Sequence, residues 1–206
     1  MVSGGVAVVV LAAGGSRRLG RPKQLEPHGG TTLLGHAVAV ALEAALGPVV
    51  VVLGAEAERC RAALDAAPRT GVASVVINRA WATGLASSIR EGIAECGRLP
   101  EPCDAALLMT CDQPLVDADH LRSLSRAMQA SGTRIAASGY AGTIGVPAAF
   151  ARSLWPELSG LAGDFGAKGV LEAHRDDVAV VPCESAAQDI DTDPGSPARL
   201  RWPHRV

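Results

Sequence analysis

The sequence has few aromatic residues, few charges and no long apolar run. Aromatic residues make up 3% of its 206 residues and charged residues 19%, and the formal net charge is −2. Without aromatic platforms or a basic surface, the chain is not expected to bind a nucleic-acid polymer. The longest apolar run, Val6 to Ala13, is far shorter than the ~20 residues that cross a bilayer, and no basic segment with a cleavage site precedes it. We therefore expect a cytoplasmic protein without a membrane partner.

Paired cysteines and clustered histidines are also absent. The cysteines are odd in number and form no CxxC pair: Cys60, Cys96, Cys103, Cys111 and Cys183. This spacing favours neither a disulfide framework nor a thiolate zinc site, and the five histidines have no metal-ligand spacing. We expect reduced thiols.

Runs rich in valine and isoleucine alternate with stretches of helical period. Hydrophobic residues make up 48% of the chain, enough for a large core. The alternation predicts an α/β fold, doubly wound, with a mostly parallel sheet and helices on both faces. We expect one domain over residues 1–206, with 194–206 as a loose or docked tail. The predicted strands are Val6–Leu11, Pro48–Leu53, Ser74–Ile77, Ala105–Thr110, Arg134–Ser138 and Val178–Val181.

Helices are predicted between these strands. The first is expected to begin near Thr31 or Thr32. The others are expected to span Ala55–Ala66, Leu85–Cys96 and Ala118–Ala130. The stretch Gly139–Pro147 contains glycine and proline and is predicted to form a loop or hairpin beside the sheet.

A basic, glycine-rich loop follows the first predicted strand. Gly14, Gly15 and Gly20 allow close approach of a ligand to the backbone, and four basic residues lie between positions 17 and 23. The loop has neither the Gly-Lys-Ser/Thr ending of a Walker A motif nor a G-x-G-x-x-G fingerprint. This composition suits a triphosphate, and the alternative is a solvated basic turn between a strand and a helix.

A second candidate lies at Asp112, where an apolar strand stops at Cys-Asp-Gln-Pro. Proline cannot continue the ladder, so Asp112 is expected at the carboxyl end of a strand. Ligands of open α/β sheets bind outside the carboxyl ends of the strands, which places Asp112 and the glycine-rich loop in one site. The alternative for Asp112 is a turn or helix-capping carboxylate.

Four segments carry a resemblance to a known family. LAAGGSRRLGRPKQL resembles the L-A-A-G-x-S-x-R-x-G-x-x-K signature of the MobA-like nucleotidyltransferases. Asn78–Ile93 resembles that family's N-x-x-W-x-x-G-x-x-x-S-I segment, Cys111–Pro114 its C-D-Q-P turn and Asp189–Asp193 its D-I-D-T segment. Within the family the chain most resembles the molybdenum cofactor cytidylyltransferases, which implies a Rossmann-like nucleotidyltransferase fold.

The resemblance also implies roles for individual residues. The nucleotide would be held by Leu11, Ala12, Ala13, Gly14, Gly15, Ser16, Lys23, Gly84, Ser87 and Ser88. Arg17 and Lys23 would stabilise charge on the leaving pyrophosphate. The Ala-Ala-Gly form of the loop is more typical of enzymes that use CTP. Ser87 as an ordinary residue of a first helical turn is an equally good interpretation.

Metal and acceptor residues follow from the same resemblance. Asp112 would bind Mg²⁺, with Mn²⁺ as an alternative, and Asp189 or Asp191 would supply a second carboxylate. We favour Asp191, although a helix-capping role for it is nearly as well supported. Asp164 and Lys168 lie in a segment that resembles the family's G-D-x-G-A-R/K turn near the acceptor, where lysine lacks the bidentate geometry of arginine.

Together these features predict transfer of a nucleoside monophosphate, CMP from CTP in the first instance, to a phosphorylated acceptor. Molybdopterin is the acceptor that the resemblance implies, and a molybdenum enzyme or an insertion chaperone is a conceivable partner. Two other functions stay open at this point. One is a relative redirected to redox work on the same fold, and the other is a non-catalytic nucleotide-binding or cofactor-insertion chaperone.

Overall fold

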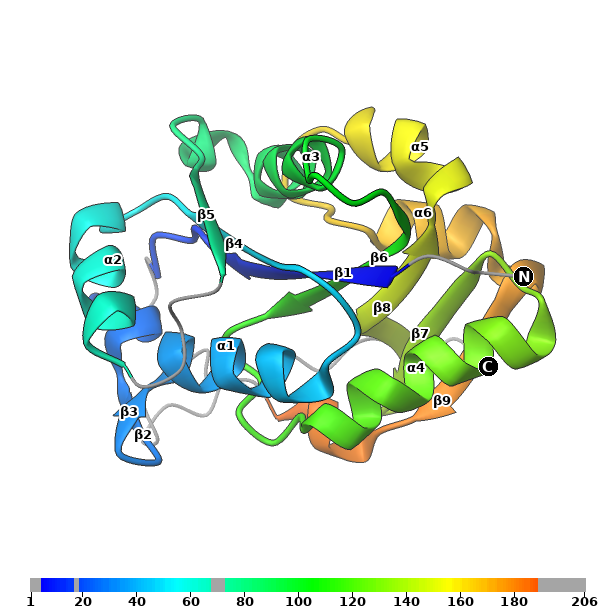
Figure 1. Cartoon of the computed structure of the whole chain (residues 1–206), viewed down its shortest axis with the longest axis horizontal. Helices are drawn as coiled ribbons and strands as arrows, with labels where there is room; N and C mark the ends of the chain where they lie inside the picture. Colours follow the sequence, from blue (N-terminus) through cyan, green and yellow to red (C-terminus); the bar gives the residue numbers. More distant parts are fainter. Residues whose placement is uncertain (1–4, 17–18, 68–72, 189–206) are drawn as a thin grey trace.

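A seven-stranded sheet forms the centre of the protein, with helices on both faces (Figure 1). The computed structural model describes residues 5–16, 19–67 and 73–188. The strands of the main sheet are β1 (Gly5–Ala12), β4 (Val49–Leu53), β5 (Ser74–Ile77), β6 (Cys103–Thr110), β7 (Ile135–Tyr140), β8 (Thr143–Ala151) and β9 (Val178–Pro182). A separate two-stranded hairpin consists of β2 (Pro27–His28) and β3 (Thr31–Thr32).

The helices connect these strands in the alternating order that the sequence predicts. They are α1 (Leu33–Ala44), α2 (Ala57–Ala66), α3 (Leu85–Cys96), α4 (Ala118–Ser131), α5 (Trp155–Ser159) and α6 (Lys168–Ala173). Short 3-10 turns are η1 (Lys23–Leu25), η2 (Trp81–Thr83), η3 (Arg152–Leu154), η4 (Arg175–Asp177) and η5 (Glu184–Ala187). None of the helices among the described residues is long and apolar enough to cross a membrane.

The strand order β5-β4-β1-β6-β8-β7-β9 brings the first strand to the middle of the sheet. The neighbours β5, β4, β1 and β6 are parallel, and only β8 runs against them. The carboxyl ends of the parallel strands therefore lie along one edge of the sheet. This confirms the predicted mostly parallel, doubly wound α/β fold.

Alternate residues of β1 enter two separate cores, because successive side chains of a strand point to opposite faces. Val8 and Val10 pack in the core under α1, α2 and α4, whereas Val9 and Leu11 pack in the core under α3, α5 and α6. Figure 1 shows α3 and α5 on one side of the sheet and α1 and α4 on the other. Burial of both faces explains why β1 is an almost continuous apolar run.

Two helix starts have the caps that their sequences favour. The Thr32 hydroxyl accepts a hydrogen bond of 3.1 Å from the backbone N–H of Gly35, so α1 begins after Thr32. The carboxylate of Asp117 accepts one of 2.8 Å from the N–H of His120 at the start of α4. The cap of α4 is thus Asp117 and not Asp112.

The predicted position of Gly139–Pro147, beside the sheet, is wrong. The segment does form a hairpin, but β8 lies inside the sheet, between β6 and β7. Ala137 pairs with Ala148 and Ser138 with Gly145, so Val146 and Pro147 form a bulge. A bulge accepts a proline because the ladder there needs no N–H, and the sequence signal for a loop was misleading for this reason.

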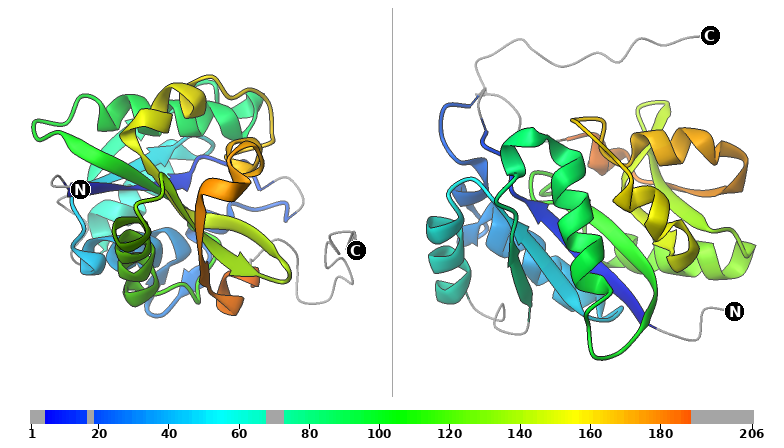
Figure 2. Two further views of the ribbon diagram at one scale, coloured as in Figure 1. Left: turned by 90° about the vertical axis from the view of Figure 1, so that its right-hand side faces the viewer. Right: turned by 90° about the horizontal axis from the view of Figure 1, so that it is seen from above.

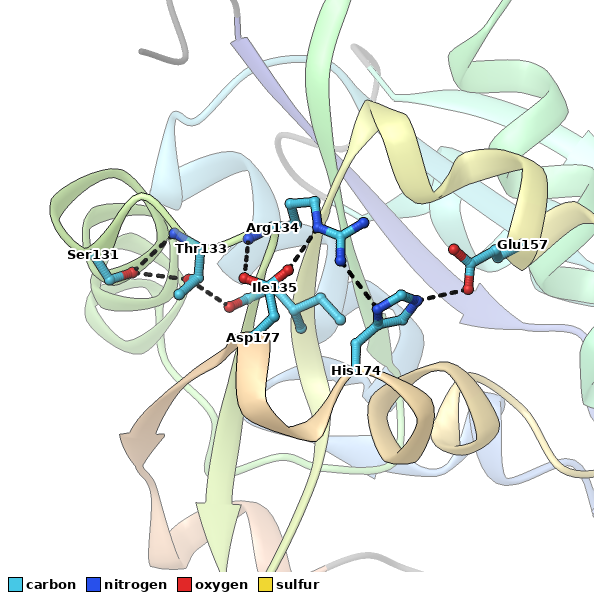
Figure 3. Close-up of polar contacts among 7 residues, drawn as sticks. All are labelled: Ser131, Thr133, Arg134, Ile135, Glu157, His174 and Asp177. Atoms are coloured by element: carbon cyan, nitrogen blue, oxygen red, sulfur yellow. Dashed lines mark hydrogen bonds and ion pairs between the residues drawn. The ribbon is translucent and has the colours of Figure 1, made fainter.

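A network of polar side chains ties α5 and α6 to the amino end of β7 (Figure 3). Arg134 Nε lies 2.6 Å from the carboxylate of Asp177, and its guanidinium contacts His174 Nδ1 at 3.1 Å. His174 Nε2 in turn lies 2.7 Å from the carboxylate of Glu157. The Arg134 guanidinium lowers the pKa of Asp177. These residues lie at the end of β7 opposite the carboxyl edge of the sheet, so we assign them to the architecture.

Helix α3 lies along β1 and β4 (Figure 2), and Gly92 allows this close contact. A Cβ atom at Gly92 would come within 2.5 Å of Val9 Cγ1 and 3.2 Å of Val52 Cγ2. Gly169 in α6 is the opposite case, since a Cβ there would meet nothing within 4 Å.

We expect Gly92→Ala to lower the free energy of unfolding by about 1 to 3 kcal/mol, because the added methyl group overpacks the contact between α3 and the sheet. Gly169→Ala, also in a helix, should raise it by about 0.5 to 1 kcal/mol, because alanine favours the helix. Urea unfolding monitored by circular dichroism measures both. Equal effects of the two substitutions would contradict this account of α3 packing.

Candidate active site

Loops from the carboxyl ends of four parallel strands meet at one edge of the sheet. The loop after β1 contacts the loop after β4, because the Ala55 N–H donates to the Ala13 carbonyl at 3.0 Å. The loop after β5 is joined to β4 by a bond of 2.7 Å from the Asn78 N–H to the Leu53 carbonyl. A Cβ at Gly54 would lie 2.6 Å from Trp81 and 2.7 Å from Ala13, so only glycine fits between these loops.

The loops after β1, β4 and β5 line an open cavity of about 310 Å³. Its lining consists of Gly14, Gly15, Gly20, Arg21, Pro22, Gly54, Ala55, Glu56 and Trp81. The glycine-rich loop forms one wall, and the Trp81 ring lies against Gly15, where a Cβ would come within 2.8 Å of the indole. The loop that the sequence singled out therefore lines a concave site rather than forming a fully solvated turn.

The loop after β1 is held by its own side chains. The Ser16 hydroxyl accepts a hydrogen bond of 3.0 Å from the Lys23 N–H, and it lies 3.4 Å from Gln24 Oε1. Ser16 has a φ of 47°, and its carbonyl accepts from the N–H groups of Leu19 and Gly20, each at 3.1 Å. The Ser16 side chain, which the sequence analysis placed on the nucleotide, thus organises the loop itself.

Lys23 and Asp112 form an ion pair across the site. Lys23 Nζ lies 2.5 Å from Asp112 Oδ2, and the two side chains are 19% and 14% exposed. Asp112 follows the end of β6, as the sequence predicts, and Lys23 begins η1 at the end of the glycine-rich loop. The fold therefore brings together two candidate catalytic residues that are 89 positions apart.

Gln113 fixes the turn that carries Asp112. Its side-chain amide donates to the Val146 carbonyl at 3.1 Å and to the Ala186 carbonyl at 2.8 Å, and its oxygen accepts from the Thr110 hydroxyl at 3.2 Å. The turn after β6 is thereby joined to β8 and to η5. These bonds limit the positions that the Asp112 carboxylate can take.

The start of α3 is built around Asn78. The Asn78 amide donates to the hydroxyls of Ser87 at 2.8 Å and Ser88 at 3.0 Å, and both serines are only 3% exposed. The Ser87 hydroxyl donates in turn to the Gly84 carbonyl at 2.8 Å. The fold uses these two hydroxyls internally, where they hold the first turn of α3. Nucleotide contact by this segment stays a prediction.

The predicted acceptor segment lies against the start of α3. The Gly163 carbonyl accepts a bond of 3.1 Å from the Ala86 N–H. A Cβ at Gly84 would come within 2.7 Å of the Asp164 carboxylate. Lys168, at the start of α6, pairs with Glu172 at 3.5 Å. The structure thus joins Asp164 to the predicted nucleotide segment, and acceptor binding by Asp164 and Lys168 stays a prediction.

Three predicted site residues lie outside the described residues. They are Arg17, in the glycine-rich loop, and Asp189 and Asp191, in the segment after η5. Across the described ranges, histidine, cysteine, aspartate and glutamate side chains do not gather in groups of three that could hold a metal ion. The described part of the proposed metal site is therefore Asp112 with Lys23 beside it.

Cys111 is adjacent to Asp112 but is unsuited to nucleophilic chemistry. It is 4% exposed, and burial raises the pKa of its thiol, with the Asp112 carboxylate adding to the effect. A thiol must lose its proton to react as a nucleophile. The five cysteines are free in the structure.

No site role was predicted for Gln24, Asn78, Trp81 or Gln113, which occur in the sequence only as parts of motifs. Gln24, Asn78 and Gln113 are polar residues that are at most 8% exposed. A buried amide in a loop has to be hydrogen-bonded, so such residues mark the fixed points of a site. Their burial depends on contacts between distant segments, which local patterns do not reveal.

Comparisons with known proteins identify the family of the chain. The model of the MobA-like NTP transferase domain matches residues 8–178. The chain is 31% identical over 198 residues to nicotine blue oxidoreductase of Paenarthrobacter nicotinovorans, covering 91% of this chain and 92% of that protein. It is 29% identical to purine catabolism protein PucB of Bacillus subtilis, covering 89% and 90%.

Solved structures give the same result. The structure of Rv0371c from Mycobacterium tuberculosis is similar with a TM-score of 0.77 and 33% identity, over 92% of this chain and 94% of that one. Another structure of Rv0371c, described as a complex with manganese, is similar with a TM-score of 0.70 and 30% identity, over 87% and 89%. On the match over residues 8–178, the chain belongs to the MobA-like NTP transferase domain family and has the fold of a nucleotidyltransferase.

Proposed function

We propose that the protein transfers CMP from CTP to a phosphorylated acceptor of the molybdopterin type and releases pyrophosphate. The observation that carries this proposal is the Lys23–Asp112 pair beside a glycine-rich loop, at the edge where parallel sheets bind ligands. The family supports nucleotidyl transfer. The Ala-Ala-Gly form of the loop supports CTP, and the four motif segments support the acceptor.

A divalent metal fits the donors of this site. Asp112 offers a partly exposed carboxylate oxygen, a ligand type that Mg²⁺ and Mn²⁺ prefer, and Mg²⁺ usually takes one or two carboxylates together with phosphate oxygens. Asp112 would hold the metal, with Asp191 or Asp189 as a second ligand. When bound, the metal would neutralise charge on the phosphates. The solved manganese complex of a relative supports a divalent ion.

The chain's own residues bind and orient the substrates. The backbone of the loop after β1 holds the phosphates, and Lys23 places a positive charge where the leaving pyrophosphate develops negative charge. Arg17 belongs to the same loop and is proposed to act with Lys23. A phosphate oxygen of the acceptor forms the new bond to the α-phosphorus as the bond to the β-phosphate oxygen breaks. The acceptor phosphate is ionised at neutral pH, so the chain needs no general base.

The cavity beside the loop is the proposed place of the cytosine ring. Its wall contains the backbone of Gly54–Glu56 and the indole of Trp81, which together suit a planar heterocycle. The segment with Asp164 and Lys168 is proposed to face the acceptor, because it lies against Gly84 at the start of α3.

A redox activity on the same scaffold is the second candidate. One observation favours it: a relative named an oxidoreductase is 31% identical over 91% of this chain. Turnover that depends on a nicotinamide cofactor and persists in EDTA would support this second function.

Neutralising either member of the central ion pair should abolish transfer. We expect Asp112→Asn and Lys23→Gln each to lower kcat by about 100-fold or more. Lys23 opposes the negative charge that grows on the pyrophosphate in the transition state, and Asp112 would hold the metal that neutralises charge on the phosphates. The measurement is pyrophosphate release at saturating CTP and Mg²⁺, with circular dichroism to verify folding.

The matched control is the exposed pair Arg61–Asp65 on α2, whose atoms lie 3.2 Å apart and whose side chains are 55% and 66% exposed. Arg61→Gln and Asp65→Asn make the same chemical changes and should leave kcat within about twofold, because exposed pairs contribute little. Undiminished turnover of folded Asp112→Asn would refute the assignment of Asp112.

The nucleotide and the metal are tested in one assay. We expect pyrophosphate release from CTP to need both Mg²⁺ or Mn²⁺ and molybdopterin, and to exceed that from ATP, GTP and UTP by about tenfold or more, the discrimination that one well-placed hydrogen bond supplies. EDTA should stop the reaction, and added metal should restore it. Equal release from all four nucleotides would contradict the choice of CTP, and release without metal would contradict the metal site.

A further inference from the structure

Gln24 is a buried polar residue next to Lys23, and no step of the proposed transfer uses it. Its side chain is in the interior, at 1% exposure for the residue, directly beneath the glycine-rich loop. The side-chain nitrogen donates to two carbonyls, that of Ala12 at the end of β1 at 3.1 Å and that of Gly14 in the loop at 2.5 Å. Its oxygen faces the Ser16 hydroxyl at 3.4 Å.

Two carbonyl acceptors on one side-chain atom establish that this atom is the amide nitrogen. An amide nitrogen has two hydrogens to donate, whereas an oxygen in its place would face two other oxygens. The opposite end of the same amide meets a hydroxyl, which can donate. Gln24 therefore forms hydrogen bonds with three groups at once. Rotating its amide by half a turn would break the bonds to both carbonyls.

The bond to Gly14 determines where the next N–H points. In a trans peptide the carbonyl of one residue and the N–H of the next point in opposite directions. Because the Gly14 carbonyl is turned down toward Gln24, the Gly15 N–H points away from the interior. Gly14 and Gly15 are exposed, and both line the cavity. Gln24 thus turns a carbonyl, which would repel an anion, away from the ligand side of the loop.

We propose that Gln24 is a positioning residue that sets the polarity of the loop, so that N–H groups and not carbonyls face a polyphosphate. The inference rests on the proposed function for the class of ligand, a nucleoside triphosphate, and it adds a requirement at position 24 for a side chain with two donors. It concerns binding and is independent of the acceptor and of transfer.

Gln24→Glu removes the donors with almost no change of shape. The oxygen that replaces the amide nitrogen would face two carbonyl oxygens and, even when protonated, could donate to only one of them, so the peptide between Gly14 and Gly15 should turn over and present its carbonyl to the ligand. We expect the affinity for CTP and for inorganic tripolyphosphate to fall by about tenfold or more, the size of one hydrogen bond to a charged group. The affinity for cytidine, which has no phosphate, should stay within about twofold. Isothermal titration calorimetry at constant Mg²⁺ measures all three ligands.

Two further variants separate polarity from stability. Gln24→Met has a similar length, no donor and no charge, and should show the same selective loss if Gln24→Glu fails to fold. Gln129→Glu adds the same charge at an exposed position of α4 and should bind all three ligands as the native protein does. Circular dichroism and thermal melting establish which variants are folded.

Each outcome bears on the proposal. A selective loss for the two phosphate ligands supports it. Equal losses for cytidine and CTP would show a general structural role, and unchanged CTP affinity in a folded variant would overturn the proposal. Failure of the native protein to bind CTP or tripolyphosphate would overturn it as well. Native protein that binds CTP but releases no pyrophosphate would refute the proposed transfer and leave the role of Gln24 standing.

Discussion

The parallel pairing of β1 with β4 on one side and β6 on the other is the constraint on which the site depends. Since these strands run in one direction, the loops that follow them must emerge at the same edge of the sheet. Lys23 and Asp112 lie 89 residues apart in the chain, and this pairing brings the two loops that carry them to the same edge. An antiparallel β6 would carry Asp112 to the opposite end of the molecule. The same constraint brings Trp81 next to the glycine-rich loop.

Much of this arrangement could be predicted from short-range features of the chain. The continuous apolar runs predict buried strands, Thr32 predicts the start of α1, and the stop at Asp112 predicts a strand end at the ligand edge. These predictions succeed because they depend on the chemistry of a few adjacent residues. The basic loop was identified in the same way, since its glycines and cations are contiguous. The family then followed from four motifs in order.

Features that arise from side-chain contacts across turns and loops could not be predicted. Pro147 indicated a loop, but a bulge opposite Ser138 admits it to an interior strand. Ser87 and Ser88 were predicted to bind the nucleotide, and the hydrogen bonds that their hydroxyls accept from Asn78 inside the protein were not foreseen. Gln24 resembled an ordinary polar residue after a lysine. In each case the deciding contact is made across a turn or a loop, where neither helical nor strand periodicity applies, so the local pattern is compatible with more than one role. Arg17, Asp189 and Asp191 lie outside the described residues and stay predictions.

The contact between Lys23 and Asp112 also determines the electrical state of the resting protein. Each charge already has a counter-charge, so the edge of the sheet presents a nearly neutral pair and not two bare ions. A phosphate that approaches Lys23 competes with the carboxylate for the ammonium group, and a cation that approaches Asp112 competes with the ammonium group for the carboxylate. Each ligand removes the competitor of the other, so anion and cation favour each other's entry. The pair therefore makes ligand binding an exchange of ions, in which the substrate and its counter-ion arrive most easily together.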